Sequence, residues 1–194
     1  MKTFFLLIIL FSASFANAQT SPVKWATQET FFEELVGKGL PDFKGIDVNT
    51  KPFLSSSLEG KIVVINFWFE ACPPCVKEIP ELNILVEKYG KDGVKFIAIT
   101  YDLSKQAKKF QKQSGYKYEI VSLTNDEISK LNINHGYPSN ILIGKDGKII
   151  KAISTFSFNN EIPSIKQQTL VFEEKIRTEI TNTASRAVQI NVVQ

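Results

Sequence analysis

A continuous apolar segment, an amphipathic helix and a second apolar segment constrain the fold of this chain most strongly. Ile62–Phe69 (IVVINFWF) and Val94–Thr100 (VKFIAIT) are apolar and rich in β-branched residues, which is typical of strands buried on both faces. Between them, Pro73–Tyr89 repeats apolar residues at the spacing of one helix face. A strand, a helix and a strand in this order form a crossover unit, so we expect the two strands to be parallel.

The remaining elements extend this unit into a mixed sheet. Helices are predicted over Ser104–Ser114 and Asn125–Leu131. The apolar runs Asn140–Gly144 and Lys148–Ile153 flank Lys145-Asp146-Gly147, and Asp-Gly between apolar runs predicts an antiparallel hairpin. The sequence therefore predicts an α/β fold, with a mixed central β-sheet flanked by α-helices and a hairpin at one edge.

The two ends of the chain give weaker patterns. Glu29–Val36 could form a short helix or a strand, and Leu40–Gly60 has the Gly, Pro, Ser and Asn content of turns, with room for one edge hairpin. Glu161–Ile180 is predicted to be the C-terminal helix, with Pro163 in its first turn, where a missing N–H costs little. Thr181–Gln194 is polar and is predicted to fray.

The first residues have the pattern of a secretory signal peptide. Lys2 supplies a short positive start, and Phe4–Phe11 (FFLLIILF) is an apolar run too short to span a bilayer comfortably. Ala16-Asn17-Ala18 fits an A-x-A cleavage site. We therefore expect cleavage after Ala18 and export to the periplasm, with a retained membrane anchor or a buried helix as the alternative. No Cys lies near this site, which excludes lipid attachment there.

Composition excludes several kinds of chemistry. The 194 residues include one His and two Cys, which cannot supply a His cluster for zinc, copper or non-haem iron, or an iron–sulfur cluster. The formal net charge of +3 is too small to indicate binding of nucleic acid or of an anionic membrane surface. We therefore expect no metal, no bound cofactor and no nucleic-acid partner.

The two cysteines stand in the sequence Cys72-Pro73-Pro74-Cys75, where the first apolar strand meets the helix. Two residues between cysteines on a helical turn bring their Cα atoms to roughly 5–6 Å, within reach of a disulfide. Cys72 falls at the helix N-terminus, where backbone N–H groups and the helix dipole stabilise a thiolate, so it is the predicted nucleophile. Cys75, one turn deeper, is expected to be shielded and is the predicted resolving thiol. Since Pro73 and Pro74 lack an N–H, few donors stabilise the thiolate, which predicts a pair toward the reducing side of its class.

Three other roles for the cysteine pair are alternatives to redox catalysis. A structural disulfide this local closes a very small loop and removes little entropy from the unfolded chain. Half of a zinc site lacks its other ligands unless two chains meet. A haem-attachment site fails because Val76, not His, follows Cys75. A redox-active Cys72–Cys75 disulfide is therefore the favoured interpretation.

Lys61–Pro80 (KIVVINFWFEACPPCVKEIP) resembles the active-site segment of thioredoxin-fold proteins. It is most similar to the exported TlpA-like thiol–disulfide oxidoreductases of the thiol-specific antioxidant (redoxin) superfamily. Downstream, Gly136-Tyr137-Pro138 and the following NILIGKDGKI resemble the cis-proline loop and closing strands of that family. The similarity covers about residues 40–155. The expected organisation is a signal peptide (1–18), an N-terminal extension (19–39), a thioredoxin-like domain with its C-terminal helix (40–180) and a flexible tail (181–194).

The resemblance implies a set of site residues, which are Cys72, Cys75, Glu78 and Pro138. Glu78 matches a Glu three residues after the second Cys, and such a carboxylate would take a proton from Cys75; a surface charge is the alternative. Pro138 would be the cis-proline that faces the disulfide. Asn66 lies where other thioredoxins keep a buried Asp.

Three departures from the family pattern surround the cysteines. Ala71 stands where the family usually has Trp, and Phe69-Glu70 replaces the common Ala-Thr. Loss of the indole is expected to uncover Cys72. Tyr137 stands before the proline, where a smaller or β-branched residue is common, and its bulk is expected to narrow substrate choice.

Together these residues predict an exported enzyme that reduces disulfides in other exported proteins. The implied partners are those proteins, with apocytochrome c as one candidate by resemblance alone, and a membrane protein that supplies electrons. A thiol peroxidase that uses Cys72 is one alternative, although Phe69-Glu70-Ala71 lacks the Thr and Pro that usually precede a peroxidatic Cys. A binding module or chaperone in which the cysteine pair is incidental is the other.

Overall fold

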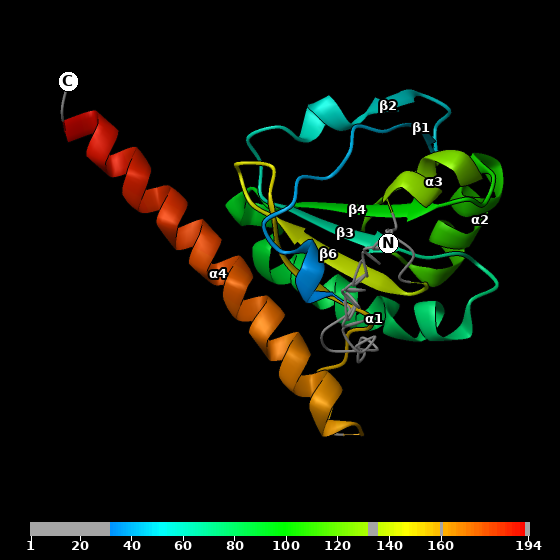
Figure 1. Ribbon diagram of the computed structural model, residues 1–194. Coiled ribbons are helices and arrows are strands. Elements are labelled where there is room, and N and C mark those ends of the chain that lie inside the picture. The colour runs from blue at the N-terminus through cyan, green and yellow to red at the C-terminus, as the bar shows by residue number, and fades with distance from the viewer. Residues whose placement is uncertain (1–31, 132–135, 160, 193–194) are drawn as a thin grey trace, which may run out of the picture.

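The computed structural model describes residues 32–131, 136–159 and 161–192, in which one sheet is surrounded by helices (Figure 1). The strands are β1 (Lys44–Asp47), β2 (Pro52–Leu54), β3 (Val63–Phe67), β4 (Lys95–Thr100), β5 (Glu119–Ser122), β6 (Ser139–Ile143) and β7 (Ile149–Ile153). The α-helices are α1 (Pro73–Tyr89), α2 (Ser104–Ser114), α3 (Asn125–Leu131) and α4 (Pro163–Val192). Short 3-10 helices are η1 (Glu33–Leu35), η2 (Ser55–Leu58) and η3 (Gly90–Asp92).

The sheet is mixed and has the strand order β2-β1-β5-β4-β3-β6-β7. β3, β4 and β5 are parallel, whereas β6 pairs antiparallel with β3. The connections from β3 to β4 and from β4 to β5 move in the same direction across the sheet, so right-handed crossovers place α1 and α2 on one face. The predicted parallel crossover unit and the predicted α/β class are therefore confirmed.

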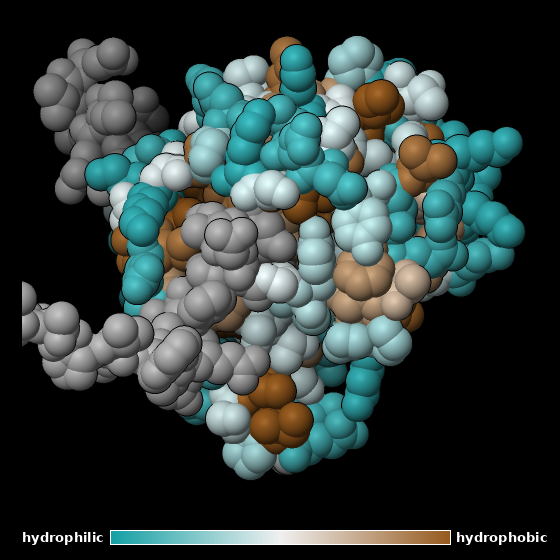
Figure 2. Space-filling view, turned by 45° about the vertical axis from the view of Figure 1, so that its right-hand side comes forward, coloured by the Kyte–Doolittle hydropathy of each residue, from teal (hydrophilic) through white to brown (hydrophobic). Residues whose placement is uncertain are grey.

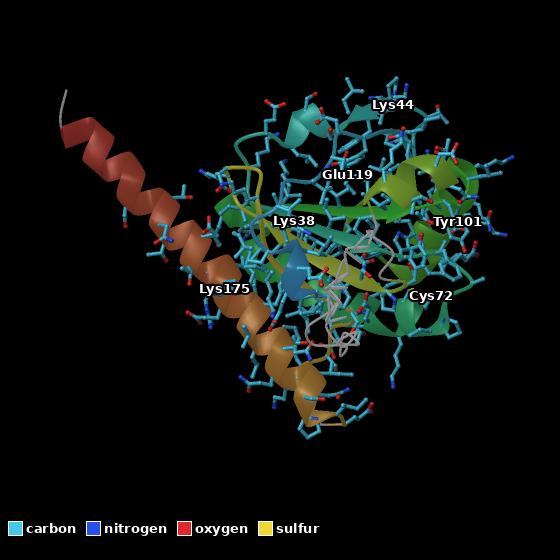
Figure 3. The ribbon with its side chains drawn as sticks, in the orientation of Figure 1. Lys38, Lys44, Cys72, Tyr101, Glu119 and Lys175 are labelled. Atoms are coloured by element: carbon cyan, nitrogen blue, oxygen red, sulfur yellow. A yellow bond between two sulfur atoms is a disulfide. The ribbon has the colours of Figure 1, made fainter. Side chains whose placement is uncertain are left out.

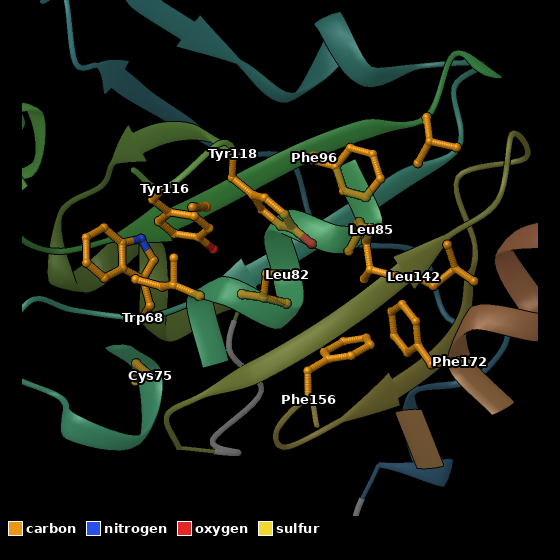
Figure 4. Close-up of a cluster of buried hydrophobic side chains, with 14 of the residues drawn as sticks. Trp68, Cys75, Leu82, Leu85, Phe96, Tyr116, Tyr118, Leu142, Phe156 and Phe172 are labelled. Atoms are coloured by element: carbon orange, nitrogen blue, oxygen red, sulfur yellow. The ribbon is translucent and has the colours of Figure 1, made fainter. Parts of the chain in front are cut away.

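Two clusters of buried side chains fill the two faces of the sheet. On the face covered by α1, α2 and α4, the cluster includes Trp68, Leu82 and Phe172 (Figure 4). On the opposite face, η1 and α3 contribute Leu35 and Ile128. Trp68 is fully buried and is part of the core on this face.

Both antiparallel hairpins occur where the sequence indicates them. β6 and β7 are joined through Asp146-Gly147, and Gly147 has a φ of +75°, a left-handed conformation that glycine adopts without strain. β1 and β2 form the edge hairpin within 40–60. The sequence analysis missed β5, a four-residue strand whose Ile120 and Val121 are buried.

The C-terminal helix is longer than predicted. α4 begins at Pro163 and continues to Val192, whereas the sequence pattern ended the helix at Ile180 and left 181–194 as a flexible tail. No Gly or Pro follows Pro163 before Val192, so nothing in the chain stops the helix once its first half has docked. Its far end projects away from the sheet (Figure 1).

Some predicted features lie outside the described residues. The signal peptide (1–18) and residues 19–31 of the predicted extension are among them. Within the described part of the chain, no helix has both the length and the hydropathy that crossing a bilayer requires.

Candidate active site

The cysteine pair lies where β3 ends and α1 begins. Cys72 is the N-cap residue of α1, and Pro73 and Pro74 occupy the first two helical positions. Cys72 and Cys75 form a disulfide with their Cα atoms 5.3 Å apart. The amide of Cys75 donates a hydrogen bond to the Cys72 Sγ over 3.3 Å, as expected when the two prolines lack an N–H. Figure 3 shows Cys72 and Tyr101, which follows β4, on the same side of the molecule.

Both cysteines are buried in this disulfide form. Cys75 is 0% exposed, in agreement with the expected shielding of the resolving thiol, and Cys72 is 4% exposed. The expectation that Ala71 leaves Cys72 uncovered is therefore wrong. Phe69 and Tyr137 pack against the cluster that contains both cysteines, and aromatic rings of this size fill the space that a missing indole would leave.

Three aromatic rings form a connected group beside the disulfide. Phe69 stacks on Tyr101 with the ring centroids 5.1 Å apart, and Tyr137 meets Phe69 edge-on at 5.2 Å and Tyr101 at 6.1 Å. We call Phe69, Tyr101 and Tyr137 the aromatic triad. The sequence analysis singled out Phe69 and Tyr137 but not Tyr101, because only the parallel pairing of β3 with β4 brings the ends of these strands together.

Pro138 lies at the same end of the sheet as the disulfide. The Tyr137–Pro138 peptide bond is cis, as the resemblance implied, and Pro138 is buried. It immediately precedes β6, whose first residue Ser139 pairs with Phe67 at the end of β3. Because Cys72 follows β3 by a short loop, this register brings the proline loop close to α1. His135 of this loop lies outside the described residues.

Glu78 is a buried carboxylate one helical turn after Cys75. It is 2% exposed, which excludes the surface-charge interpretation. Burial raises the pKa of Glu78 from 4.5 to about 7, against hydrogen bonds that lower it. The backbone N–H of Phe156 and the Thr155 hydroxyl donate to Oε2 over 2.8 and 2.9 Å. A carboxyl that titrates near neutral pH can accept and release a proton under physiological conditions.

Two asparagines hold the other side of this carboxylate. Asn66 on β3 and Asn140 on β6 are directly paired across the sheet, and both are buried. Asn66 Nδ2 donates to Glu78 Oε1 over 2.7 Å and to Asn140 Oδ1 over 2.9 Å. Asn140 Nδ2 also donates to Glu78, at 3.3 and 3.4 Å. The Tyr116 hydroxyl donates to Asn66 Oδ1 over 2.8 Å, which directs the amide N–H₂ toward Glu78.

The sequence analysis named Asn66 but missed Asn140, Thr155 and Tyr116. A polar residue inside an apolar strand was the available signal for Asn140, since a buried amide requires hydrogen-bond partners. Thr155 and Tyr116 carry no such signal. They reach Glu78 and Asn66 from connecting segments that only the folded chain brings together.

A pocket of about 210 Å³ gives solvent access to the Glu78 side of α1. Its lining residues are Pro74, Lys77, Glu78, Glu81, Thr155, Phe156, Ser157, Asn159, Glu161, Ile162 and Ile165. Because Glu78 and its donor Thr155 both line this pocket, a proton taken up by the carboxylate has a route to water. Among the described side chains, no group of three or more His, Cys, Asp or Glu is arranged to hold a metal ion.

Comparison with known proteins gives a consistent family. The sequence profile of the AhpC/TSA family matches residues 36–152. The thiol-disulfide oxidoreductase ResA of Bacillus cereus (strain ATCC 10987 / NRS 248) is 35% identical over 153 residues, which cover 78% of this chain and 87% of the relative.

Two crystal structures from Chlorobium tepidum share the fold. One, assigned as the thiol:disulfide interchange protein DsbE, has a TM-score of 0.63 and 25% identity over 75% of this chain and 97% of its own. The other, a thiol:disulfide interchange protein of the thioredoxin family from strain TLS, has a TM-score of 0.56 and 26% identity over 70% and 95%. The predicted thioredoxin-like fold is thereby confirmed.

Proposed function

The chain belongs to the AhpC/TSA family and is a thiol–disulfide oxidoreductase, and from this premise we propose that it reduces disulfides in other exported proteins through Cys72, Cys75, Glu78 and Pro138. The proposal rests mainly on one observation. A disulfide at the N-terminus of α1 stands one helical turn from a buried carboxylate whose pKa is about 7. A structural disulfide needs no such base, whereas a resolving thiol does.

In the reduced enzyme, the Cys72 thiolate attacks one sulfur of the substrate disulfide. A Cys72–substrate disulfide forms, and the other substrate sulfur leaves as a thiolate. Glu78 then takes the proton of Cys75, and the Cys75 thiolate attacks the Cys72 sulfur. The second substrate sulfur leaves, so two electrons have passed to the substrate and the enzyme holds the Cys72–Cys75 disulfide. The proton on Glu78 is released to water through the pocket that it lines.

The direction and the location of this reaction are also part of the proposal. The Cys72 sulfur accepts one backbone hydrogen bond, from Cys75, and a weakly stabilised thiolate favours the reducing direction. The signal-peptide pattern of residues 1–18 supports export. A reductase outside the cytoplasm needs an electron supply, so a membrane electron-transfer protein would return the disulfide to two thiols. Apocytochrome c remains one candidate client.

Substrate trapping tests this function. In Cys75→Ser, mixed disulfides on Cys72 cannot be resolved, so the variant is expected to retain exported proteins that contain Cys. Cys72→Ser, which lacks the nucleophile, is the matched control and should retain none. Recovery of glutathione alone would contradict a role in protein reduction. Consumption of peroxide by the wild type, lost in the double Cys→Ser variant, together with no reduction of insulin, would favour a thiol peroxidase instead.

A further inference from the structure

A second pocket, of about 640 Å³, lies beside the active site. Its walls come from the β1–β2 hairpin, from the segment after β4 and from the loop between β5 and α3. Apolar side chains of all three segments line it, among them Ile46, Leu54, Tyr101, Leu103 and Leu123. We call this the hairpin pocket. The mechanism above makes no use of it.

The hairpin pocket gathers exposed apolar side chains to an unusual degree. Of the eight large apolar side chains that are exposed in the described part of the chain, four line this pocket. Leu103 is 74% exposed, Leu54 55%, Ile46 47% and Tyr101 40%. Figure 2, in which the right-hand side of Figure 1 comes forward, shows hydrophobic side chains among hydrophilic ones on this face. Grouped exposed apolar side chains of this kind mark binding surfaces.

The pocket is continuous with the active site through the aromatic triad. Tyr101 is a wall of the pocket and also stacks on Phe69, whose carbonyl accepts a hydrogen bond from the Cys72 N–H over 3.1 Å. Tyr137, which precedes the cis-proline, contacts the other two rings of the triad. The aromatic triad therefore connects the loop that carries Cys72 to the pocket.

The polar groups of the pocket fit a polypeptide ligand. Lys44, Asp102 and Glu127 bring charges of both signs to its lining, whereas a fatty or membrane ligand would need none. An apolar floor with polar groups around it is the usual arrangement of a protein-binding site.

We propose that the hairpin pocket binds an apolar side chain of the polypeptide whose disulfide is exchanged at Cys72, and that it thereby selects clients with such a residue near the reactive cysteine. This inference rests on the proposed function, since it assigns a client feature to the same site. Contacts in the pocket would stabilise the mixed disulfide with Cys72 and lower the KM for the client. They would leave the sulfur chemistry unchanged.

The test uses disulfide-linked peptides that are identical except for one residue, Leu or Ser, placed at increasing distances from the cysteine. The second-order rate of exchange with the full-length enzyme is measured for each peptide and for oxidised glutathione, which has no apolar extension. At the best distance, Leu is expected to give a rate about tenfold above Ser, which corresponds to partial burial of one Leu side chain. Leu103→Ser should abolish this preference without slowing exchange with glutathione.

Matched variants separate the pocket from general surface effects. Leu170→Ser removes an exposed apolar side chain of the same type from α4, far from the pocket lining, and should keep the Leu preference. Thr124→Trp fills the pocket from an exposed position and should remove the preference as Leu103→Ser does.

Equal rates with Leu and Ser peptides at every distance would overturn the inference, even if exchange itself is fast. So would a wild-type dimer that Leu103→Ser dissociates, because a second copy would then occupy the pocket. Failure to exchange with any disulfide, glutathione included, would instead overturn the proposed function and this inference with it.

Discussion

The role proposed for Glu78 depends on its surroundings and not on its residue type alone. Its surroundings decide whether a helical Glu is a solvated charge or a base, and here burial raises its pKa to about 7 while several donors keep it from rising further. The donors come from β3, from β6 and from the segment after β7. The hydrogen bonds that lower the pKa of Glu78 therefore come from two strands and the segment after a third, and not from its own helix.

Replacement of Glu78 by Gln keeps the shape and removes the base. Disulfide exchange at neutral pH is expected to slow by about 10²-fold, the lower end for loss of acid–base catalysis. In the wild type the rate should fall as the pH drops through about 7, because Glu78 then becomes protonated, and this inflection should be absent from the variant. Stopped-flow reduction of a peptide disulfide measures both effects. An unchanged rate with an unchanged pH profile would remove Glu78 from the mechanism.

Thr155 provides a matched pair of variants for the same measurement. Thr155→Val removes the hydroxyl that donates to Glu78 Oε2, so the pKa of Glu78 should rise and the inflection should move to higher pH. Thr155→Ser keeps the hydroxyl and should leave the inflection in place. A shift of equal size in both variants would mean that packing, not the hydrogen bond, sets the pKa.

At the scale of elements, the first turn of α1 determines how many backbone N–H groups can donate to the Cys72 sulfur. An N-cap side chain accepts hydrogen bonds from the amides of the second and third helical positions. Pro74 occupies the second position and has no N–H, so the Cys75 amide at the third is the donor that remains. The helix N-terminus therefore offers Cys72 its dipole but fewer hydrogen bonds than an ordinary helix would.

Pro74→Ala restores the missing donor. We expect a lower pKa for the Cys72 thiol, and a reduction potential higher by roughly 10–30 mV, the equivalent of one hydrogen bond of about 0.5–1.5 kcal/mol to the thiolate of the reduced form. Pro73→Ala is the control, because the amide of the first position does not face the N-cap side chain. Equilibration with a glutathione buffer measures the potential. A lower or unchanged potential in Pro74→Ala would contradict the role assigned to this proline.

At the scale of the whole molecule, the burial of Glu78 makes the stability of the fold depend on pH. Between about pH 4.5 and 7, folded Glu78 keeps its proton while the unfolded chain has lost it, so the folded state binds more protons. The contribution of Glu78 to the free energy of unfolding must then fall as the pH rises through this window, and stay constant above it. The rise of the pKa from 4.5 to about 7 corresponds to roughly 3 kcal/mol.

This coupling predicts how Glu78→Gln changes stability. Relative to the wild type, the variant should become more stable as the pH rises from about 4.5 to 7, by roughly 3 kcal/mol in total. The altered hydrogen bonds add a difference in stability that does not depend on pH and does not affect this change. Urea unfolding at a series of pH values gives the difference. A stability difference that does not change with pH would show that Glu78 titrates alike in both states.

Local sequence patterns were sufficient to predict the crossover unit, both hairpins and the chemistry of the cysteine pair. These features depend on local patterns: apolar strands, helical spacing, a turn dipeptide, and two cysteines one helical turn apart. The strand β5 was missed because it is only four residues long, and the end of α4 was placed too early because polarity was read as fraying. Local patterns are least informative for short strands and for helices whose ends leave the core.

The surroundings of the disulfide depend on contacts between distant segments of the folded chain. The pairing of Asn66 with Asn140 across β3 and β6, and the approach of Thr155 and Tyr116, join segments far apart in the chain. The same holds for the contacts of the aromatic triad and for the burial of Cys72, which the sequence suggested was uncovered. Burial and hydrogen bonding depend on which strand ends lie side by side, and strand order is a property of the folded sheet. That is why the candidate site residues could be read from the sequence, whereas the environment that sets the pKa of Glu78 could not.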